Sequence, residues 1–272
     1  MALGDLVTAD YIYEYNELAL GVTTNYDLEG VEFIQGFGIR SERIERFGRH
    51  GATAGRHYAL GKSVIFTGHI RAATDAAYET NRRALGSAFA PIVSPVNKLP
   101  LVTQFPGTGS TKVQAEARTL NLVIPINRQH ARMYGGFTIR MEVPNPILYS
   151  LTSTTTNFAV PTDTENITNG GNAPAKWIAT LVGPADDPIL TNNDTSQVLD
   201  LTGLTLSGAE ETLVYDSYDS TVKVNGASVG TSLATGFSWF DFDPGVNNIK
   251  FEATNAATAS FSITHNDAYW SV

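Results

Sequence analysis

Strand-length runs of β-branched and aromatic residues, bounded by Gly, Pro, Asn or Asp, recur along the whole of this 272-residue chain. In the second half, seven such runs follow one another with no helical periodicity between them: KWIATLV, QVLDL, TLVYD, TVKVN, FSWFDFD, NNIKFEA and TASFSIT. The first half contains four, at residues 11–21, 31–39, 63–70 and 135–143. Regularly spaced short strands are typical of antiparallel sheets. The sequence therefore predicts a mainly β protein whose second half is an antiparallel β-sandwich.

One segment, residues 74–91, has helical periodicity instead. Its sequence, TDAAYETNRRALGSAFAP, starts with Thr74, a residue type that caps helix N-termini, and ends at a proline. Tyr78, Leu85 and Phe89 fall on one face at helical spacing. We therefore expect a helix near residues 74–90. The residues expected on its polar face are Asn81, Arg82 and Arg83.

Charge divides the chain near Pro144. Residues 1–145 hold 15 Lys and Arg against 13 Asp and Glu, a net of +2, whereas residues 146–272 hold 3 against 14, a net of −11. The Thr- and Asn-rich stretch 151–171 lies at this border and has few large apolar residues. Such asymmetry suggests two units. We expect an N-terminal domain over residues 1–145, containing the helix, and a C-terminal domain over residues 146–272.

The chain contains no cysteine, which excludes disulfides, thiolate metal ligands and cysteine nucleophiles. No apolar run approaches the ~20 residues that a membrane span requires. The first residues also lack the basic and apolar regions of a secretory signal. We therefore expect that the chain does not insert into a membrane and that it folds in a cytoplasm.

GRHYALGKS, residues 55–63, ends like a phosphate-binding loop. That loop needs four residues between its first Gly and the Gly-Lys pair, and a helix that starts at the following Ser or Thr. Here five residues separate Gly55 from Gly61, and Ser63 opens the strand-like run SVIFTGHI. We therefore expect two strands around a turn, with no bound nucleotide and no other cofactor.

Three further patterns suggest chemistry, and each has a simpler structural interpretation. GASVG, residues 226–230, places Ser228 as in a serine hydrolase, but its flanks predict a hairpin and not a strand-turn-helix corner. The histidines show no recognised metal-ligand spacing; they are His50, His57, His69, His130 and His265. Four aspartates offer carboxylate pairs for glycoside cleavage but no sign of a cleft; they are Asp216, Asp219, Asp241 and Asp243. We therefore expect no catalytic residue, no metal site and no enzyme.

The arginine-rich run GIRSERIERFGRHGATAGRH, residues 38–57, raises the question of nucleic-acid binding. Its acids interleave with its bases, and it offers no aromatic stacking platform. A solvated face or a subunit interface is the better interpretation. The residues assigned to this interface are Arg40, Glu42, Arg43, Glu45, Arg46 and Arg49.

Several stretches form one pattern of Gly, Pro and apolar positions along nearly the whole chain. In the N-terminal half they are GVEFIQGFGIRS, RHGATAGRHYALGKSVIFTGHI and TDAAYETNRRALGSAF. In the C-terminal half they are PILTN, QVLDLTGLTLSGAEETLVYD, TVKVNG and FDFDPGVNNIKFEA, followed by the aromatic pair Tyr269 and Trp270. Taken together, this pattern resembles the siphophage distal tail protein family, whose members are components of the phage tail-tip hub.

The resemblance implies a fold and a place in the virion. It implies an N-terminal β-rich domain with one helix that forms a hexameric ring, and a C-terminal galectin-like antiparallel β-sandwich on the outside. Such a protein is structural, is assembled in the host cytoplasm, and joins the tail tube protein to tail-tip hub and receptor-binding proteins. DNA would pass through the lumen without specific binding, and Arg82 and Arg83 would face either the lumen or a neighbouring copy.

Two other functions stay open. The aromatic-rich second half suggests a carbohydrate-binding adhesion protein of the tail tip, with saccharide contacts at Trp177, Trp239 and Trp270. A glycan-cleaving tail enzyme rests only on the four aspartates named above. A galectin-like fold does not decide the matter, because function belongs to the site and not to the fold.

We predict that cleavage within residues 146–171 leaves two independently folded fragments, because composition and charge both change there. Limited proteolysis, followed by thermal unfolding of each fragment, measures this. A C-terminal fragment that lacks a cooperative transition would contradict the two-domain interpretation.

Overall fold

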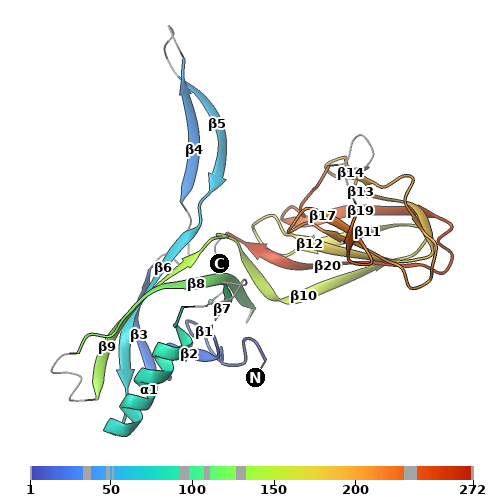
Figure 1. Ribbon diagram of the computed structural model, residues 1–272. Helices are drawn as coiled ribbons and strands as arrows, with labels where there is room; N and C mark the ends of the chain where they lie inside the picture. Colours follow the sequence, from blue (N-terminus) through green and yellow to red (C-terminus); the bar gives the residue numbers. More distant parts are fainter. Residues whose placement is uncertain are drawn as a thin grey trace. The chain divides into compact units, whose positions relative to one another are not determined.

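The structure is a computed structural model, and it shows mostly β-strands and one helix (Figure 1). It describes residues 2–32, 38–46, 50, 52–91, 98–106, 111–126, 133–229 and 238–270. The chain divides into two compact units, one of Met1–Leu151 with Trp270–Val272 and one of Thr152–Tyr269. The predicted mainly β class is therefore confirmed, while independent folding of the two parts stays a prediction. Within the described residues, no helix combines the length and apolar character needed to cross a bilayer.

The N-terminal unit consists of antiparallel strands, of which one serves two sheets. The strands are β1 (Tyr13–Tyr15), β2 (Leu18–Leu20), β3 (Tyr26–Glu32), β4 (Ile39–Glu45), β5 (Ala52–Ala59), β6 (Lys62–Arg71), β7 (Leu99–Gln104), β8 (Lys112–Val123), β9 (Tyr134–Val143) and the beginning of β10 (Leu148–Phe158). Residues 112–117 of β8 pair with β7, whereas residues 118–123 pair with β9 across a register shift. Two sheets result, β2-β1-β7-β8 and β3-β6-β9-β8.

The sheet β3-β6-β9-β8 has one buried and one open face, because side chains alternate along each strand. In β6 and β9 every second residue is buried, including Val64, Phe66, Phe137 and Ile139. The helix α1 (Asp75–Ala88) contacts the side on which these residues lie. There the Tyr26 hydroxyl donates to the carbonyl of Asn81 at 2.9 Å.

The start of α1 follows the sequence prediction. Thr74 is extended and its hydroxyl accepts a hydrogen bond from the backbone N–H of Ala77 at 3.2 Å, as an N-cap does. Tyr78 and Leu85 are buried, and Phe89, just after the helix, is buried as well. The predicted cap and the predicted apolar face are both confirmed.

β4 and β5 form a separate two-stranded sheet, here called the arm, that extends away from the other strands of its unit in Figure 1. The strand β6 then begins at Lys62. The sequence GRHYALGKS therefore joins the end of β5 to the beginning of β6, so two strands do surround a turn, and no helix starts at Ser63.

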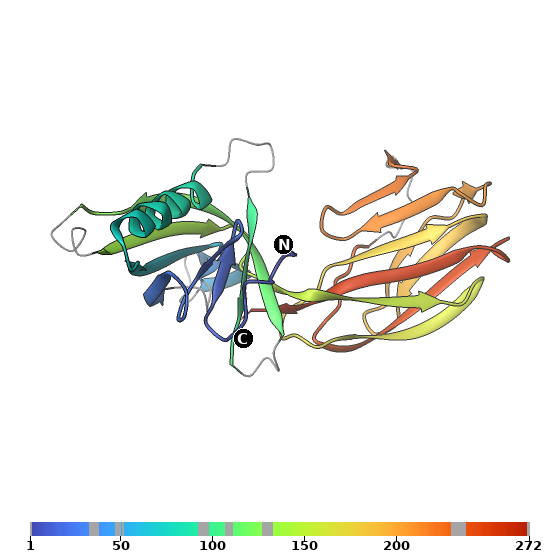
Figure 2. The same ribbon diagram turned by 90° about the horizontal axis from the view of Figure 1, so that it is seen from below.

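The C-terminal unit is a sandwich of two antiparallel sheets (Figure 2). Besides the second part of β10, its strands are β11 (Thr162–Asn169), β12 (Trp177–Val182), β13 (Ala185–Asn192), β14 (Gln197–Asp200), β15 (Thr205–Leu206), β16 (Thr212–Asp216), β17 (Thr221–Val224), β18 (Ala227–Ser228), β19 (Gly245–Thr254) and β20 (Ser260–Tyr269). One sheet has the order β18-β17-β16-β12-β20-β10, and the other has β11-β19-β13-β14 with β15 beside β13. The predicted sandwich is confirmed.

One predicted strand of the sandwich is wrong. Within FSWFDFD, the described residues 238–243 form no strand, and only Phe242 makes a bridge, to Ala175. Phe240 and Phe242 are both buried and Trp239 between them is half-buried, which is the alternation that a strand would also show. These aromatic side chains pack around Trp177 and hold an irregular segment against the core. The segment is as rich in aromatic residues as a strand, which explains the wrong prediction.

Two neighbouring glycines test how α1 packs. A Cβ on Gly135, which is on the buried side of β9, would lie 1.9 Å from the Tyr78 hydroxyl oxygen, whereas a Cβ on Gly136 would have no atom nearer than 3.9 Å. We expect Gly135→Ala to lower the free energy of unfolding by about 1–3 kcal/mol through overpacking, and Gly136→Ala to have little effect. Denaturant unfolding of the two variants measures this.

The Tyr78→Phe substitution supplies a control, because it removes the oxygen that Gly135→Ala would clash with. The double variant should recover part of the stability lost by Gly135→Ala. If both glycine variants lose the same stability, strand propensity and not helix packing explains the effect.

Candidate assembly surfaces

The sheet β3-β6-β9-β8 has two open edges. β3 pairs only with β6, and its edge is open after Tyr26, whose backbone N–H and C=O are hydrogen-bonded to Thr24 and Gly21; residues 118–123 of β8 pair only with β9. In the part of the chain that the structure describes, no strand adds to either edge. An open edge presents unpaired backbone N–H and C=O groups and is a template for another chain.

The two edges differ in charge. β3, with the sequence YDLEGVE, carries Asp27, Glu29 and Glu32 and no basic residue. The β8 edge, residues 118–123, carries Arg118 and no acid. Its apolar side chains are exposed to an unusual degree: Leu120 is 50% exposed, Val123 is 46% exposed, and Ile126 just beyond the strand is 87% exposed. One edge is therefore acidic, while the other is apolar with a positive charge.

The open face between these edges is polar and internally paired. Arg118 lies 2.6 Å from Glu142, and His69 Nδ1 lies 2.9 Å from Glu29 Oε1. Arg71 is paired with Asp27. The His69 ring also stacks on Tyr134, with ring centroids 4.3 Å apart. The two arginine–carboxylate pairs match opposite charges on the face, whereas His69 and Glu29 form an ion pair only when His69 is protonated.

Arg82 and Arg83 do not belong to the open face. Both lie on α1, which contacts the other side of the sheet. Arg82 is held by Glu79, with 2.8 Å between Arg82 Nη2 and Glu79 Oε2, and this pair raises the pKa of Arg82. Arg83 is exposed.

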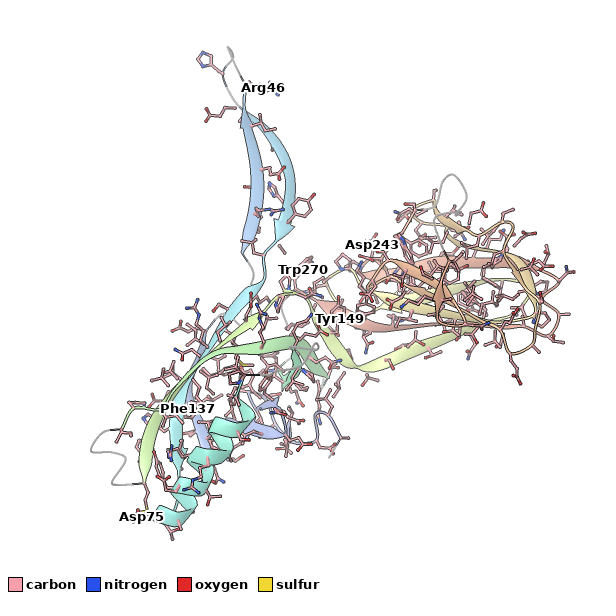
Figure 3. The ribbon with its side chains drawn as sticks, in the orientation of Figure 1. Arg46, Asp75, Phe137, Tyr149, Asp243 and Trp270 are labelled. Carbon is pink, nitrogen blue, oxygen red and sulfur yellow. The ribbon has the colours of Figure 1, made fainter. Side chains whose placement is uncertain are left out.

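The arm carries the charges that the sequence assigned to an interface. Arg40 lies over the ring of Tyr58, with its guanidinium carbon 5.3 Å from the ring centroid. Arg46 marks the end of β4 in Figure 3, and Glu42 and Glu45 are exposed with it. The side chain of Arg43 and all of Arg49 lie outside the described residues. The role of these arginines and glutamates at an interface stays a prediction.

Apolar side chains of the arm are exposed as well. Ile39 is 58% exposed, Ile44 is 68% exposed, and Tyr58 is 45% exposed. A two-stranded sheet is marginally stable in water unless another surface covers it. The arm is therefore a second surface that would be stabilised by contact with another protein surface.

The three tryptophans are not equivalent. Trp177 is fully buried, its indole Nε1 donates to the carbonyl of Phe240 at 2.9 Å, and its ring stacks on Phe242 with centroids 5.8 Å apart. A saccharide cannot reach it, so its assignment as a saccharide contact is wrong: it is the centre of the sandwich core. Trp239 and Trp270 are half-buried, and for them saccharide contact stays a prediction.

The GKS and GASVG motifs, which suggested nucleotide binding and a serine hydrolase, both have structural roles. Lys62 of the GKS motif is nearly buried, with Nζ 3.5 Å from the carbonyl of Trp270, and burial lowers the pKa of Lys62 to about 8. Ser228 is at the end of β18 in a hairpin that turns through Asn225 and Gly226, both with positive φ. The hairpin interpretation of GASVG is therefore confirmed.

The remaining candidates for catalysis or metal binding are scattered or already engaged. Asp241 forms an ion pair with Lys176 at 2.8 Å, and Asp216 accepts backbone N–H groups of Tyr218 and Asp219 in a turn. Over the described ranges, no three His, Asp or Glu side chains are grouped to hold a metal ion. His130 lies outside those ranges.

Comparison with known proteins identifies relatives. Residues 170–269 match the family model of the siphovirus-type tail component, C-terminal domain. The SPP1 Dit protein, described as a hub adsorption apparatus of phages that infect Gram-positive bacteria, superposes with a TM-score of 0.69 over 94% of this chain and 98% of its own, at 13% identity. The baseplate of phage P2 in its activated conformation gives a TM-score of 0.47 at 9% identity, over 93% of this chain and 97% of its own. No curated protein sequence matches the chain.

The match to the family model confirms the resemblance drawn from the sequence. The family model covers most of the C-terminal sandwich, and the likeness to the SPP1 protein extends the shared fold to nearly the whole chain.

Because Trp177 is buried and Trp239 is half-buried, replacing each by alanine should change the stability of the protein by different amounts. We expect Trp177→Ala to lower the free energy of unfolding by about 3–5 kcal/mol, because it leaves a large cavity and removes a buried hydrogen bond. Trp239→Ala is the matched control and should cost much less, since Trp239 is half-buried. Thermal or denaturant unfolding of both variants measures the difference. Equal losses would mean that Trp177 is not the centre of the core.

Proposed function

We propose that this chain, whose residues 170–269 match the C-terminal domain of siphovirus-type tail components, is a distal tail protein. Copies of it would form a closed ring that joins the tail tube to the tail tip and serves as the hub for adsorption proteins. The observation that carries this proposal is the pair of unlike open edges on one sheet of the N-terminal unit. In this proposal the chain is a structural virion protein, assembled in the host cytoplasm, and not an enzyme.

Ring closure follows from joining the two edges head to tail. The acidic β3 edge of one copy would lie beside the β8 edge of the next, where Leu120 and Val123 are apolar and Arg118 is paired with Glu142 of its own copy. A contact between two different patches repeats from copy to copy and closes when the rotation between copies allows it. Apolar burial would supply most of the association free energy, and charge would fix orientation. Six copies are proposed from the family resemblance.

The open face would line the lumen of such a ring. Its two arginine–carboxylate pairs cancel charge on the face, which suits a channel through which DNA passes without specific binding. Arg82 and Arg83 would then lie on the outside of the ring, because α1 contacts the other side of the sheet. From the sequence, these two arginines could face either the lumen or a neighbouring copy. In the proposed ring they would face a neighbouring copy or solvent.

The arm would be covered by a neighbouring copy. Its exposed apolar residues, Ile39, Ile44 and Tyr58, need burial, and the mixed charges of Arg40, Glu42 and Glu45 suit a contact in which each copy meets an identical one. The interface role predicted for Arg43, Arg46 and Arg49 is part of the same proposal.

The C-terminal sandwich would serve as the docking surface for receptor-binding proteins. The alternative function, a carbohydrate-binding adhesion protein of the tail tip, now depends on Trp239 and Trp270 alone, because Trp177 is buried. Glycan-array binding by the full-length protein, lost on Trp239→Ala or Trp270→Ala, would favour this alternative. Without such binding the hub remains the better proposal.

The edge contact predicts that negative charge on the β8 edge blocks assembly. We expect Leu120→Glu with Val123→Glu to leave the fold of the isolated chain unchanged, because both side chains are exposed, but to prevent incorporation into tails, because the new acids would lie beside the acidic β3 edge of the next copy. Val246→Glu in the C-terminal unit, at a valine that is 63% exposed, is the matched control and should assemble normally. Circular dichroism reports the fold, and electron microscopy of tails produced with each variant reports assembly.

Imaging of the unmodified chain in assembled particles decides the proposal itself. A closed ring on the tail axis is the expected result. Single copies around the periphery would contradict the hub and favour the adhesion function.

A further inference from the structure

The outer edge of β10 is open along residues 153–157 of the C-terminal unit. On one side β10 adjoins β20, where Thr155 Oγ1 lies 2.9 Å from Thr264 Oγ1. On the other side β8 pairs with β10 at Tyr149 and Ser150. No strand within the described ranges continues that pairing along residues 153–157.

This edge lacks the usual protection against strand addition. The sequence of residues 153–157, STTTN, contains no charge and no proline, and its threonines favour extended structure. Ser153, Thr154 and Thr155 are all exposed, so both faces of the strand are open there as well as its edge. The opposite edge of the same sheet is β18, which has only two residues.

The strand that follows β10 in the chain, β11, carries carboxylates on its inward side, and one of them, Asp163, accepts a hydrogen bond from the backbone N–H of Ala159 just after β10. In β11, Asp163 and Glu165 alternate in step with the buried residues Ile167 and Asn169, and therefore point towards the sheet that contains β10. Backbone N–H groups of Ala159 and Thr164 lower the pKa of Asp163, which keeps it charged. No Lys or Arg occurs between Arg140 and Lys176 to neutralise them.

The charge of the whole unit argues against a second copy at this edge. Residues 152–269 contain 14 acidic and 3 basic residues, so two such units placed edge to edge would repel each other. A basic segment would instead be attracted, and its backbone could satisfy the open N–H and C=O groups.

We infer that the edge of β10 at residues 153–157 binds an extended segment of a different protein by strand addition, with Lys or Arg at alternate positions facing Asp163 and Glu165. Main-chain hydrogen bonds to β10 provide the affinity, and the alternate basic side chains select the partner. This site lies in the C-terminal unit and does not depend on ring formation by the N-terminal unit.

A synthetic peptide tests the site on the full-length chain. The probe is fluorescently labelled Lys-Val-Lys-Thr-Lys-Val-Lys, and its control is the same peptide with N-methyl groups on alternate backbone nitrogens, which keeps the charge but blocks strand pairing. We expect the unmethylated peptide to bind at least about tenfold more tightly by fluorescence anisotropy. Amide hydrogen exchange should slow at residues 153–157 when it binds.

Two substitutions that remove the same charge distinguish the site from general attraction. Glu165→Gln should weaken binding of the unmethylated peptide, whereas Glu252→Gln should not, because Glu252 is on the outer face of the other sheet and is paired with Lys250. Equal affinity for the two peptides, or equal weakening by the two variants, would overturn the inference. A dimer of the chain that Thr154→Lys dissociates in sedimentation would overturn it too, since the edge would then belong to a second copy.

Discussion

The pairing of β8 with two different partners is the interaction on which the N-terminal unit depends. Its first half pairs with β7 up to Ala117, and its second half pairs with β9 from Arg118 onward. The β8–β9 pairing itself contains a register shift between Thr119 and Asn121, and a shift of this kind bends and twists a strand. Since β9 in turn pairs with β6 over ten residues, the open face and the helix-covered face are both set by this change of partner.

The same change of partner creates the open β8 edge. After residue 117, β8 leaves β7, so its second half has a partner on one side only among the described residues. The opposite edge of that sheet, β3, is open for a different reason: it is the last strand, and it carries acids. The unit thus has a complete core, with Phe66, Ile139 and Met141 fully buried, and still has unpaired edges. Its interior is complete within one copy, whereas two edges of its sheet stay open among the described residues.

The sequence predicted what local chemistry determines. The N-cap at Thr74, the buried Tyr78 and Leu85 and most strands of the sandwich follow from residue type and spacing. It could not separate an aromatic run in a strand from one in an irregular core segment, which is why residues 238–243 were assigned to a strand. It also placed Trp177 at a surface, because tryptophan occurs both in cores and at binding sites. The open edges depend on which strands pair, and the order of strands in a sheet cannot be predicted from the periodicity of any one strand.

Charge separates the two units in a way that fits their different surfaces. The N-terminal unit is nearly balanced, so identical copies can approach one another closely with little repulsion. The C-terminal unit is strongly acidic, so identical copies of it repel one another at short range and remain free to contact other proteins. In the proposed ring these two properties act together, because close packing of the N-terminal units brings the acidic units near each other without joining them. An array of separate acidic surfaces would then attract basic partners to each copy independently.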